Sequence, residues 1–231
     1  MSHARHPSRA SDAPGAPAAP GAPTTTRRVV VLSAALSESS TTTMLGERLA
    51  AATVRAAAEP IEVTTIELRD YFAEIAQAFG SFAPQRLREV FEQVAVADAV
   101  IALTPIYNTS YSGLFKSFFD VLPEDSLRGT PVLIGATGGT PRHSLALDYA
   151  VRPMLAYLKA EVLTTTVFAA TEDWGTAPDD VRPLPERIDL AGARLADAIA
   201  ARPERRVVDE FEATPSFAEM LGQFGGANSP A

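Results

Sequence analysis

Hydroxyl groups are concentrated in one short stretch of the chain, SAALSESSTTT, which spans residues 33–43. Seven of its eleven residues are serine or threonine, and a helical pattern begins within it. Hydroxyls and the free amides of a helix N-terminus are groups that bind phosphate. The stretch contains no lysine, no GxxxxGK[ST] motif and no GxGxxG motif, which argues against nucleotide hydrolysis and a Rossmann dinucleotide site. It therefore predicts a site for a mononucleotide monophosphate, such as that of FMN, with simple helix capping as the alternative.

A second polar stretch, TPIYNTSYSG, follows an apolar run. Tyr107 and Tyr111 are able to stack on or border a planar ring, and Asn108 offers both donors and acceptors. Pro105 is expected to fix the chain as it leaves the preceding strand, and Gly113 to permit close approach of the next helix. Taken alone, the stretch is equally consistent with an ordinary turn bearing two surface tyrosines.

A third stretch, TGGT, covers residues 137–140. Its two glycines would let backbone amides lie against the edge of a flat ligand, although most such pairs are simple turns. His143 follows and is the only histidine outside the first six residues. We expect it to cap or pack a helix rather than to act as a catalyst, because hydride transfer to a flavin needs no protein acid or base.

Composition excludes several other kinds of chemistry. The chain of 231 residues has no cysteine, so it has no disulfide, thiolate metal site or cysteine nucleophile. Its net charge of −8 argues against nucleic acid or an anionic membrane as the main partner. No window approaches the ~18 apolar residues of a membrane-spanning helix. We expect a cytoplasmic protein that holds no metal.

The elements that must position these stretches alternate between strand and helix. We predict a disordered Ala/Pro/Gly-rich leader over residues 1–26, a single domain over 27–202 and a tail over 203–231 that docks on a neighbouring subunit or orders on a partner. Arg27 and Arg28 before an apolar run resemble a twin-arginine signal only superficially, since no cleavage pattern follows. The predicted strands cover residues 27–33, 61–66, 99–103, 131–136 and 162–168, and the predicted helices cover 40–58, 84–97, 112–122, 143–159 and 184–201, with a linker over 70–80. This order indicates an α/β fold with a doubly wound parallel sheet, whose ligands bind beyond the carboxyl ends of the strands.

The second and third stretches also carry a family resemblance. The pattern P-x-Y-N-x-S-x-x-G-x-x-K-x-x-x-D, joined to ATGG and H-x-x-A-x-D-Y-A-x-x-P, resembles the NAD(P)H-dependent FMN reductases of the flavodoxin-like superfamily. It is most similar to the reductase components of two-component flavin systems. The resemblance implies a five-stranded sheet in the order 2-1-3-4-5 with helices on both faces. It is dense over residues 99–168, looser over 27–58 and absent from both ends of the chain.

The resemblance assigns roles to particular residues. It implies a phosphate loop over residues 34–42 and flavin-lining loops after the third and fourth strands. The implied FMN-binding residues are Ser37, Ser40, Thr41, Thr42, Pro105, Ile106, Tyr107, Asn108, Thr137, Gly138 and Gly139. Ser37 stands where the family often has arginine, which removes a charge and leaves open whether FMN is held as a cofactor or exchanged as a substrate. Lys116 and Asp120 also match, but their spacing suits an ordinary ion pair within one helix.

The activity implied is hydride transfer from nicotinamide C4 to flavin N5, followed by release of reduced FMN to a monooxygenase. The alternatives are a quinone, azo or chromate reductase with tightly bound FMN, and a flavodoxin-like electron carrier. The helix around Tyr149 and Pro153 implies a homodimer or homotetramer, with a π-type bulge at Tyr149. Whether NADH or NADPH is the donor stays open, and the candidate phosphate partners are Arg128, Arg142 and Arg152. Asp173 and Trp174, which follow the fifth strand, are further candidates for the ligand side of the sheet.

Overall fold

The computed structural model describes residues 26–175 and 182–203. The expected leader and tail lie outside these residues, apart from residues 26 and 203 at their edges. The strands are β1 (Arg27–Ser33), β2 (Ile61–Glu67), β3 (Ala99–Tyr107), β4 (Ser110–Tyr111), β5 (Pro131–Gly138), β6 (Glu161–Val162) and β7 (Val167–Ala170). The α-helices are α1 (Thr41–Ala56), α2 (Phe72–Ala78), α3 (Gln85–Ala95), α4 (Gly113–Val121), α5 (Arg152–Tyr157) and α6 (Leu184–Ala200).

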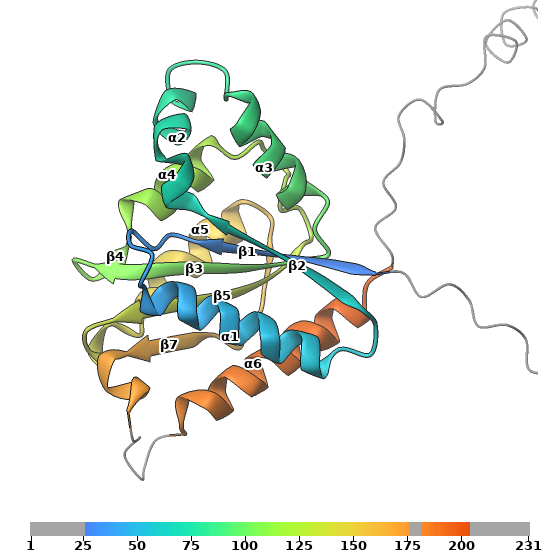
Figure 1. Cartoon of the computed structure of the whole chain (residues 1–231), viewed down its shortest axis with the longest axis vertical. Coiled ribbons are helices and arrows are strands. Elements are labelled where there is room, and N and C mark those ends of the chain that lie inside the picture. Colours follow the sequence, from blue (N-terminus) through green and yellow to red (C-terminus); the bar gives the residue numbers. More distant parts are fainter. Residues whose placement is uncertain (1–25, 176–181, 204–231) are drawn as a thin grey trace, which may run out of the picture.

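A parallel sheet runs through the middle of the molecule in the order β2-β1-β3-β5-β6, and β7 continues along β5 beyond β6 (Figure 1). Counting β6 and β7 as two parts of one strand confirms the predicted order 2-1-3-4-5. This is the flavodoxin-like order of a doubly wound sheet, in which strand order reverses between β1 and β3. The carboxyl ends of β1, β3 and β5 therefore lie side by side at one edge.

Helices cover both faces of the sheet (Figure 1). On one face, α1 and α6 bury Leu45, Leu49 and Leu195 against the strands. On the other, α2, α3, α4 and α5 bury a second core that contains Phe115 and Phe118. Because β1 and β3 are covered on both sides, almost every one of their residues is buried, which explains why they read as continuous apolar runs.

The predicted fifth strand, residues 162–168, is interrupted. β6 ends at Val162 and β7 begins at Val167. The amide of Leu163 still donates to the Val132 carbonyl of β5 at 2.9 Å, and the strand is interrupted after it. The Arg152 guanidinium donates to the carbonyl oxygens of Val162, Leu163 and Thr164, at 2.7 Å for Leu163. Three carbonyls that point out of the sheet thus have a charged donor, which the strand pattern did not reveal.

The helix predicted over residues 143–159, with a kink or bulge expected from Pro153, is divided into three parts in the structure. A 3-10 turn covers Pro141–His143, a π-helix covers Leu147–Val151 and α5 follows. Pro153 explains the change, because a proline in an α-helix has no N–H to donate and its ring clashes with the carbonyl four residues earlier. The amide of Arg152 donates to the Leu147 carbonyl, five residues back, which widens the turn before the proline. The π-type bulge implied at Tyr149 is present.

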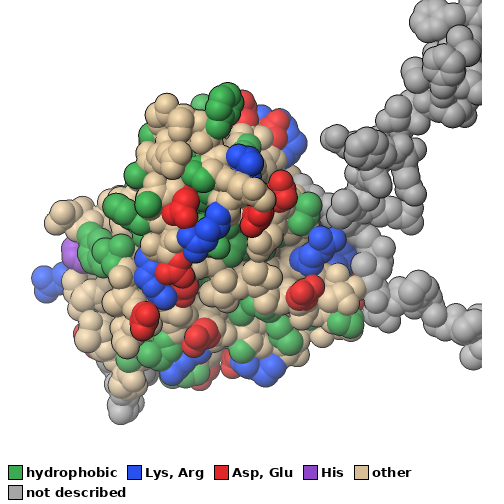
Figure 2. Space-filling model, turned by 45° about the horizontal axis from the view of Figure 1, so that its top comes forward, with side chains coloured by type: hydrophobic (Ala, Val, Ile, Leu, Met, Phe, Trp, Pro, Cys, Tyr) green, Lys and Arg blue, Asp and Glu red, His purple; other side chains and the backbone are tan. Residues whose placement is uncertain are grey.

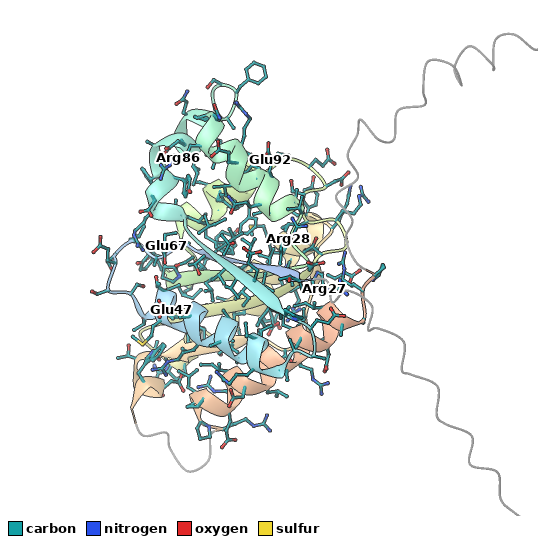
Figure 3. All side chains as sticks on the ribbon, turned by 45° about the vertical axis from the view of Figure 1, so that its right-hand side comes forward. Arg27, Arg28, Glu47, Glu67, Arg86 and Glu92 are labelled. Carbon is teal, nitrogen blue, oxygen red and sulfur yellow. The ribbon has the colours of Figure 1, made fainter. Side chains whose placement is uncertain are left out.

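The linker predicted over residues 70–80, for which a helix was the open alternative, is largely helical, with a 3-10 turn over Leu68–Tyr71 followed by α2. At the opposite end of the sheet from Glu67, Arg27 forms a buried ionic cluster (Figure 3). Its guanidinium lies 2.6 Å from Glu59 Oε2 and 3.4 Å from Asp98 Oδ1. The hydrogen bond to Glu59 is the main reason that the pKa of Arg27 is raised above its ordinary value.

Candidate functional site

The loop between β1 and α1 ends in a helix N-terminus with free donors. Ser40 is the N-cap of α1, and its Oγ accepts from the amide of Thr42 at 3.1 Å. Among the described residues, the amides of Thr41 and Thr43 have no acceptor. Ser37 and Thr41 are exposed and Ser40 is partly exposed, so hydroxyls and free amides face the same solvent-accessible space. Such an N-terminus is suited to a phosphate group.

A buried hydrogen bond connects this helix to the carboxyl end of β5. Thr42 Oγ1 and Thr137 Oγ1 are 2.7 Å apart, and both residues are buried. Next to them, Ser33 Oγ lies 3.3 Å from Thr43 Oγ1. The fold thus brings together the first and third polar stretches, which are 95 residues apart in the chain.

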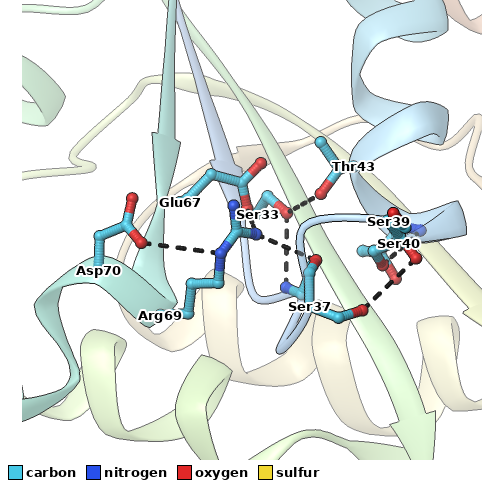
Figure 4. A network of polar contacts seen from close by, with 10 residues as sticks. Ser33, Ser37, Ser39, Ser40, Thr43, Glu67, Arg69 and Asp70 are labelled. Atoms are coloured by element: carbon cyan, nitrogen blue, oxygen red, sulfur yellow. Dashed lines mark hydrogen bonds and ion pairs between the residues drawn. The ribbon is translucent and has the colours of Figure 1, made fainter.

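Arg69 binds the backbone of the β1–α1 loop. The sequence analysis did not predict this role. Its Nη1 donates to the carbonyl of Ser37 at 3.2 Å and to Glu67 Oε2 at 2.8 Å, and its Nε lies 3.7 Å from Asp70 Oδ1 (Figure 4). The strand order is the signal that could have identified it, since residues after β2 must adjoin those after β1. The carboxylates of Glu67 and Asp70 offset the charge of Arg69. Arg69 therefore holds the loop in place but adds little net positive charge to it.

The second polar stretch is a β-hairpin rather than a loop. β3 extends to Tyr107, and β4 returns beside it with Ile106 opposite Tyr111. The two residues between the strands, Asn108 and Thr109, have φ angles of 48° and 69°. Positive φ at both positions is typical of the two-residue turn that connects twisted strands, and asparagine tolerates it well. Asn108 therefore lies at the hairpin tip.

The expectation that the chain leaves the strand at Pro105 is wrong. Pro105 still belongs to β3 and pairs with Thr137 on β5. β1 ends at Ser33, opposite Leu103, so no strand on that side requires an N–H from Pro105. Ile106 is buried while Tyr107 is half exposed, so the hairpin presents Tyr107 rather than Ile106 to solvent.

The glycines of the third stretch differ from one another. Gly138 is the last residue of β5, and a Cβ there would lie 2.8 Å from Phe168 Cζ. Around Gly139, a Cβ would meet no atom within 4 Å, so its backbone borders open space. The expected close approach at Gly113 is wrong, because a Cβ there would likewise meet nothing within 4 Å.

Several other candidate residues have structural partners. Lys116 pairs with Asp120 within α4, as predicted. Asp173 accepts from the amide of Ala170 and pairs with Arg187, and Trp174 lies under the guanidinium of Arg48 at 5.0 Å. These contacts hold α6 and α1 to the end of β7. They engage Asp173 and Trp174 in packing rather than directing them toward the phosphate loop.

Within residues 26–175 and 182–203, no three potential ligand side chains come together as a metal site. The same part of the chain has no helix with the length and apolar character needed to cross a bilayer. On the face shown in Figure 2, acidic and basic side chains are intermixed and form no continuous basic surface.

The doubly wound sheet and the hydroxyl-rich helix N-terminus after its first strand together define a flavodoxin-like protein. Comparison with known proteins identifies the family within this class. The model of the NADPH-dependent FMN reductase family matches residues 27–175, and the chain therefore belongs to that family of oxidoreductases.

Individual relatives agree. An FMN reductase (NADPH) of Pseudomonas aeruginosa is 37% identical over 146 residues, which cover 63% of this chain and 78% of the relative. The NADH-dependent FMN reductase SfnE of Pseudomonas putida is 35% identical, with 75% of this chain and 92% of the relative covered. The X-ray structure of an oxidoreductase from Corynebacterium diphtheriae superposes with a TM-score of 0.73 at 38% identity, covering 77% of this chain and 98% of that one.

Proposed function

We propose that the protein is an NAD(P)H-dependent FMN reductase that transfers a hydride from nicotinamide C4 to flavin N5 and supplies reduced FMN to a flavin-dependent monooxygenase. The observation that carries the proposal is the buried hydrogen bond between Thr42 and Thr137. It joins a helix N-terminus, whose free amides are suited to a phosphate, to the glycine-bearing end of β5, whose backbone borders open space. Family membership supplies the chemistry, and NADPH- and NADH-dependent relatives support either nicotinamide as donor.

The residues at the α1 N-terminus and at the ends of β3 and β5 are of types suited to binding FMN. The unpartnered amides of Thr41 and Thr43, with the hydroxyls of Ser37 and Ser40, are donors suited to the phosphate. The backbone from Pro105 to Asn108 and from Thr137 to Gly139 would border the ring. The flavin, when bound, accepts the hydride, and the protein's part is to hold the two rings in contact and to donate backbone hydrogen bonds where charge accumulates.

Exchange of FMN as a substrate is favoured by the electrostatics of the phosphate loop. Ser37 and Glu38 are exposed, and the guanidinium that donates to the Ser37 carbonyl, that of Arg69, is already bound by Glu67. A phosphate held by neutral donors gains less than one held by a charged pair. We therefore expect reduced FMN to dissociate, which delivery to a monooxygenase requires.

We further propose that the protein is a homodimer or homotetramer assembled through the π-helix and α5. Tyr149 and Tyr157 are 78% and 86% exposed there, and a hollow of about 830 Å³ between α4 and α5 is lined by Phe119 and Met154. Large exposed apolar side chains around a hollow are typical of an association surface. A monomer at micromolar concentration in light scattering would contradict this assembly.

The decisive test is oxidation of NADH and NADPH by the purified full chain, with and without added FMN. The proposal requires FMN-dependent oxidation of at least one nicotinamide above the rate without enzyme, and loss of flavin on gel filtration. Flavin retained through purification with ping-pong kinetics would instead favour a quinone, azo or chromate reductase. Absence of nicotinamide oxidation would refute the reductase function itself.

A further inference from the structure

We propose that Arg142, assisted by His143, binds a phosphate group of the nicotinamide dinucleotide, either the 2′-phosphate of NADPH or the pyrophosphate that both nicotinamides share. This inference rests on the proposed function. It concerns a hollow of about 320 Å³ between the tip of the β3–β4 hairpin and the residues that follow β5. Thr109 lines it from the hairpin, and Arg142, His143 and Tyr149 line it from the other side.

Among the three arginines that could meet such a phosphate, the structure separates Arg142 from the others. Arg128 lies 2.6 Å from Asp125, and Arg152 lies 3.0 Å from Asp148 while donating to carbonyl oxygens. The exposed guanidinium of Arg142 has no hydrogen bond or ion pair with any described residue. A ligand can therefore recruit Arg142 without breaking an existing ion pair.

The backbone that carries the side chains of Arg142 and His143 has two contacts with Thr140. Thr140 caps the 3-10 turn, since its Oγ1 accepts from the amide of Arg142 at 3.5 Å and its carbonyl accepts from that of His143 at 3.4 Å. Arg142 comes three residues after Gly139, so its side chain begins close to the proposed edge of the flavin. We infer that a dinucleotide whose nicotinamide lies on that flavin extends its phosphates across this part of the surface, where the hollow is.

The charge of the hollow suits an anion. None of its lining residues is acidic, although the protein as a whole carries a net charge of −8. Arginine binds phosphate through two parallel hydrogen bonds, and the imidazole of His143 and the hydroxyl of Thr109 add further polar groups at the rim. The 2′-phosphate of NADPH and the pyrophosphate common to NADPH and NADH share this chemistry.

The test compares Arg142→Ala, Arg142→Lys and the matched control Arg128→Ala, another exposed arginine, with the wild-type chain. The specificity constant is measured for NADPH and for NADH at saturating FMN, and NADP⁺ binding is measured by calorimetry without flavin. Loss of one charge-assisted contact predicts a fall of about 10- to 100-fold in Arg142→Ala, with the KM for FMN unchanged and the lysine variant intermediate. The same variant should bind NADP⁺ more weakly.

The pattern of the loss identifies the phosphate. A fall for NADPH alone identifies the 2′-phosphate, and an equal fall for both nicotinamides identifies the pyrophosphate. An effect no larger than that of Arg128→Ala, or one accompanied by a raised KM for FMN, overturns the inference while leaving the reductase function intact. Wild-type protein that binds NADP⁺ through Arg142 but does not reduce FMN would refute the proposed function instead.

Discussion

Replacing Thr137 with valine tests whether the Thr42–Thr137 hydrogen bond holds the two halves of the site together. Valine keeps the shape of threonine but substitutes a methyl group for the hydroxyl, so packing changes little. Thr42 is only 1% exposed, and its hydroxyl would lose its 2.7 Å partner without gaining access to water. An unsatisfied buried hydroxyl costs about 1–3 kcal/mol, which corresponds to a fall in Tm of roughly 2–12 °C for a domain of this size.

The decisive assay is a double-mutant cycle on the flavin-free protein, measured by urea unfolding. Thr42→Val and Thr137→Val should each be destabilising, whereas the double variant should lose much less than their sum because neither hydroxyl remains unpaired. Thr137→Ser keeps a hydroxyl and serves as the control, with a loss below that of Thr137→Val. Additive losses in the double variant would show that the two hydroxyls do not stabilise each other, and would refute this reasoning about how the site is assembled.

Three further variants test other parts of the structure. Ser37→Arg adds a cation to the exposed phosphate loop and should lower the Kd for FMN on the order of fivefold, while that for riboflavin, which has no phosphate, stays unchanged in fluorescence titration. Arg27→Met leaves the buried Asp98 carboxylate without its cation and should cost about 3–5 kcal/mol in urea unfolding, so a loss below about 1 kcal/mol would contradict the role of that cluster. Gly192→Ala would place a Cβ 2.7 Å from the backbone carbonyl carbon of Ala52 and from the backbone nitrogen of Thr53, where α6 crosses α1. It should lower stability by about 1–3 kcal/mol, with an unchanged Tm as the contrary result.

Much of the fold could be predicted because its signals are local. The apolar runs of β1 and β3 are buried on both faces, and the N-cap at Ser40 lies where a hydroxyl precedes a helical pattern. Two of the errors arose where a distant residue decides the local structure. β3 extends past Leu103 because β5 offers a partner as far as Thr137, which the short stretch cannot reveal. The break in the last strand is satisfied by Arg152, which belongs to a different element.

The sequence by itself determined the order of strands and helices, the hydroxyl-rich helix N-terminus and the resemblance to a reductase family, since composition, periodicity and motif spacing are properties of short segments. Only the tertiary structure decided which of these groups meet. It joined Thr42 to Thr137 and bound Arg69 to the carbonyl of Ser37. It left the Arg142 guanidinium without a hydrogen bond or ion pair among the described residues, while Arg128 and Arg152 were paired. The physical reason is that hydrogen bonds and ion pairs depend on distances of a few ångströms, and for residues far apart in the chain those distances are set by how strands and helices pack.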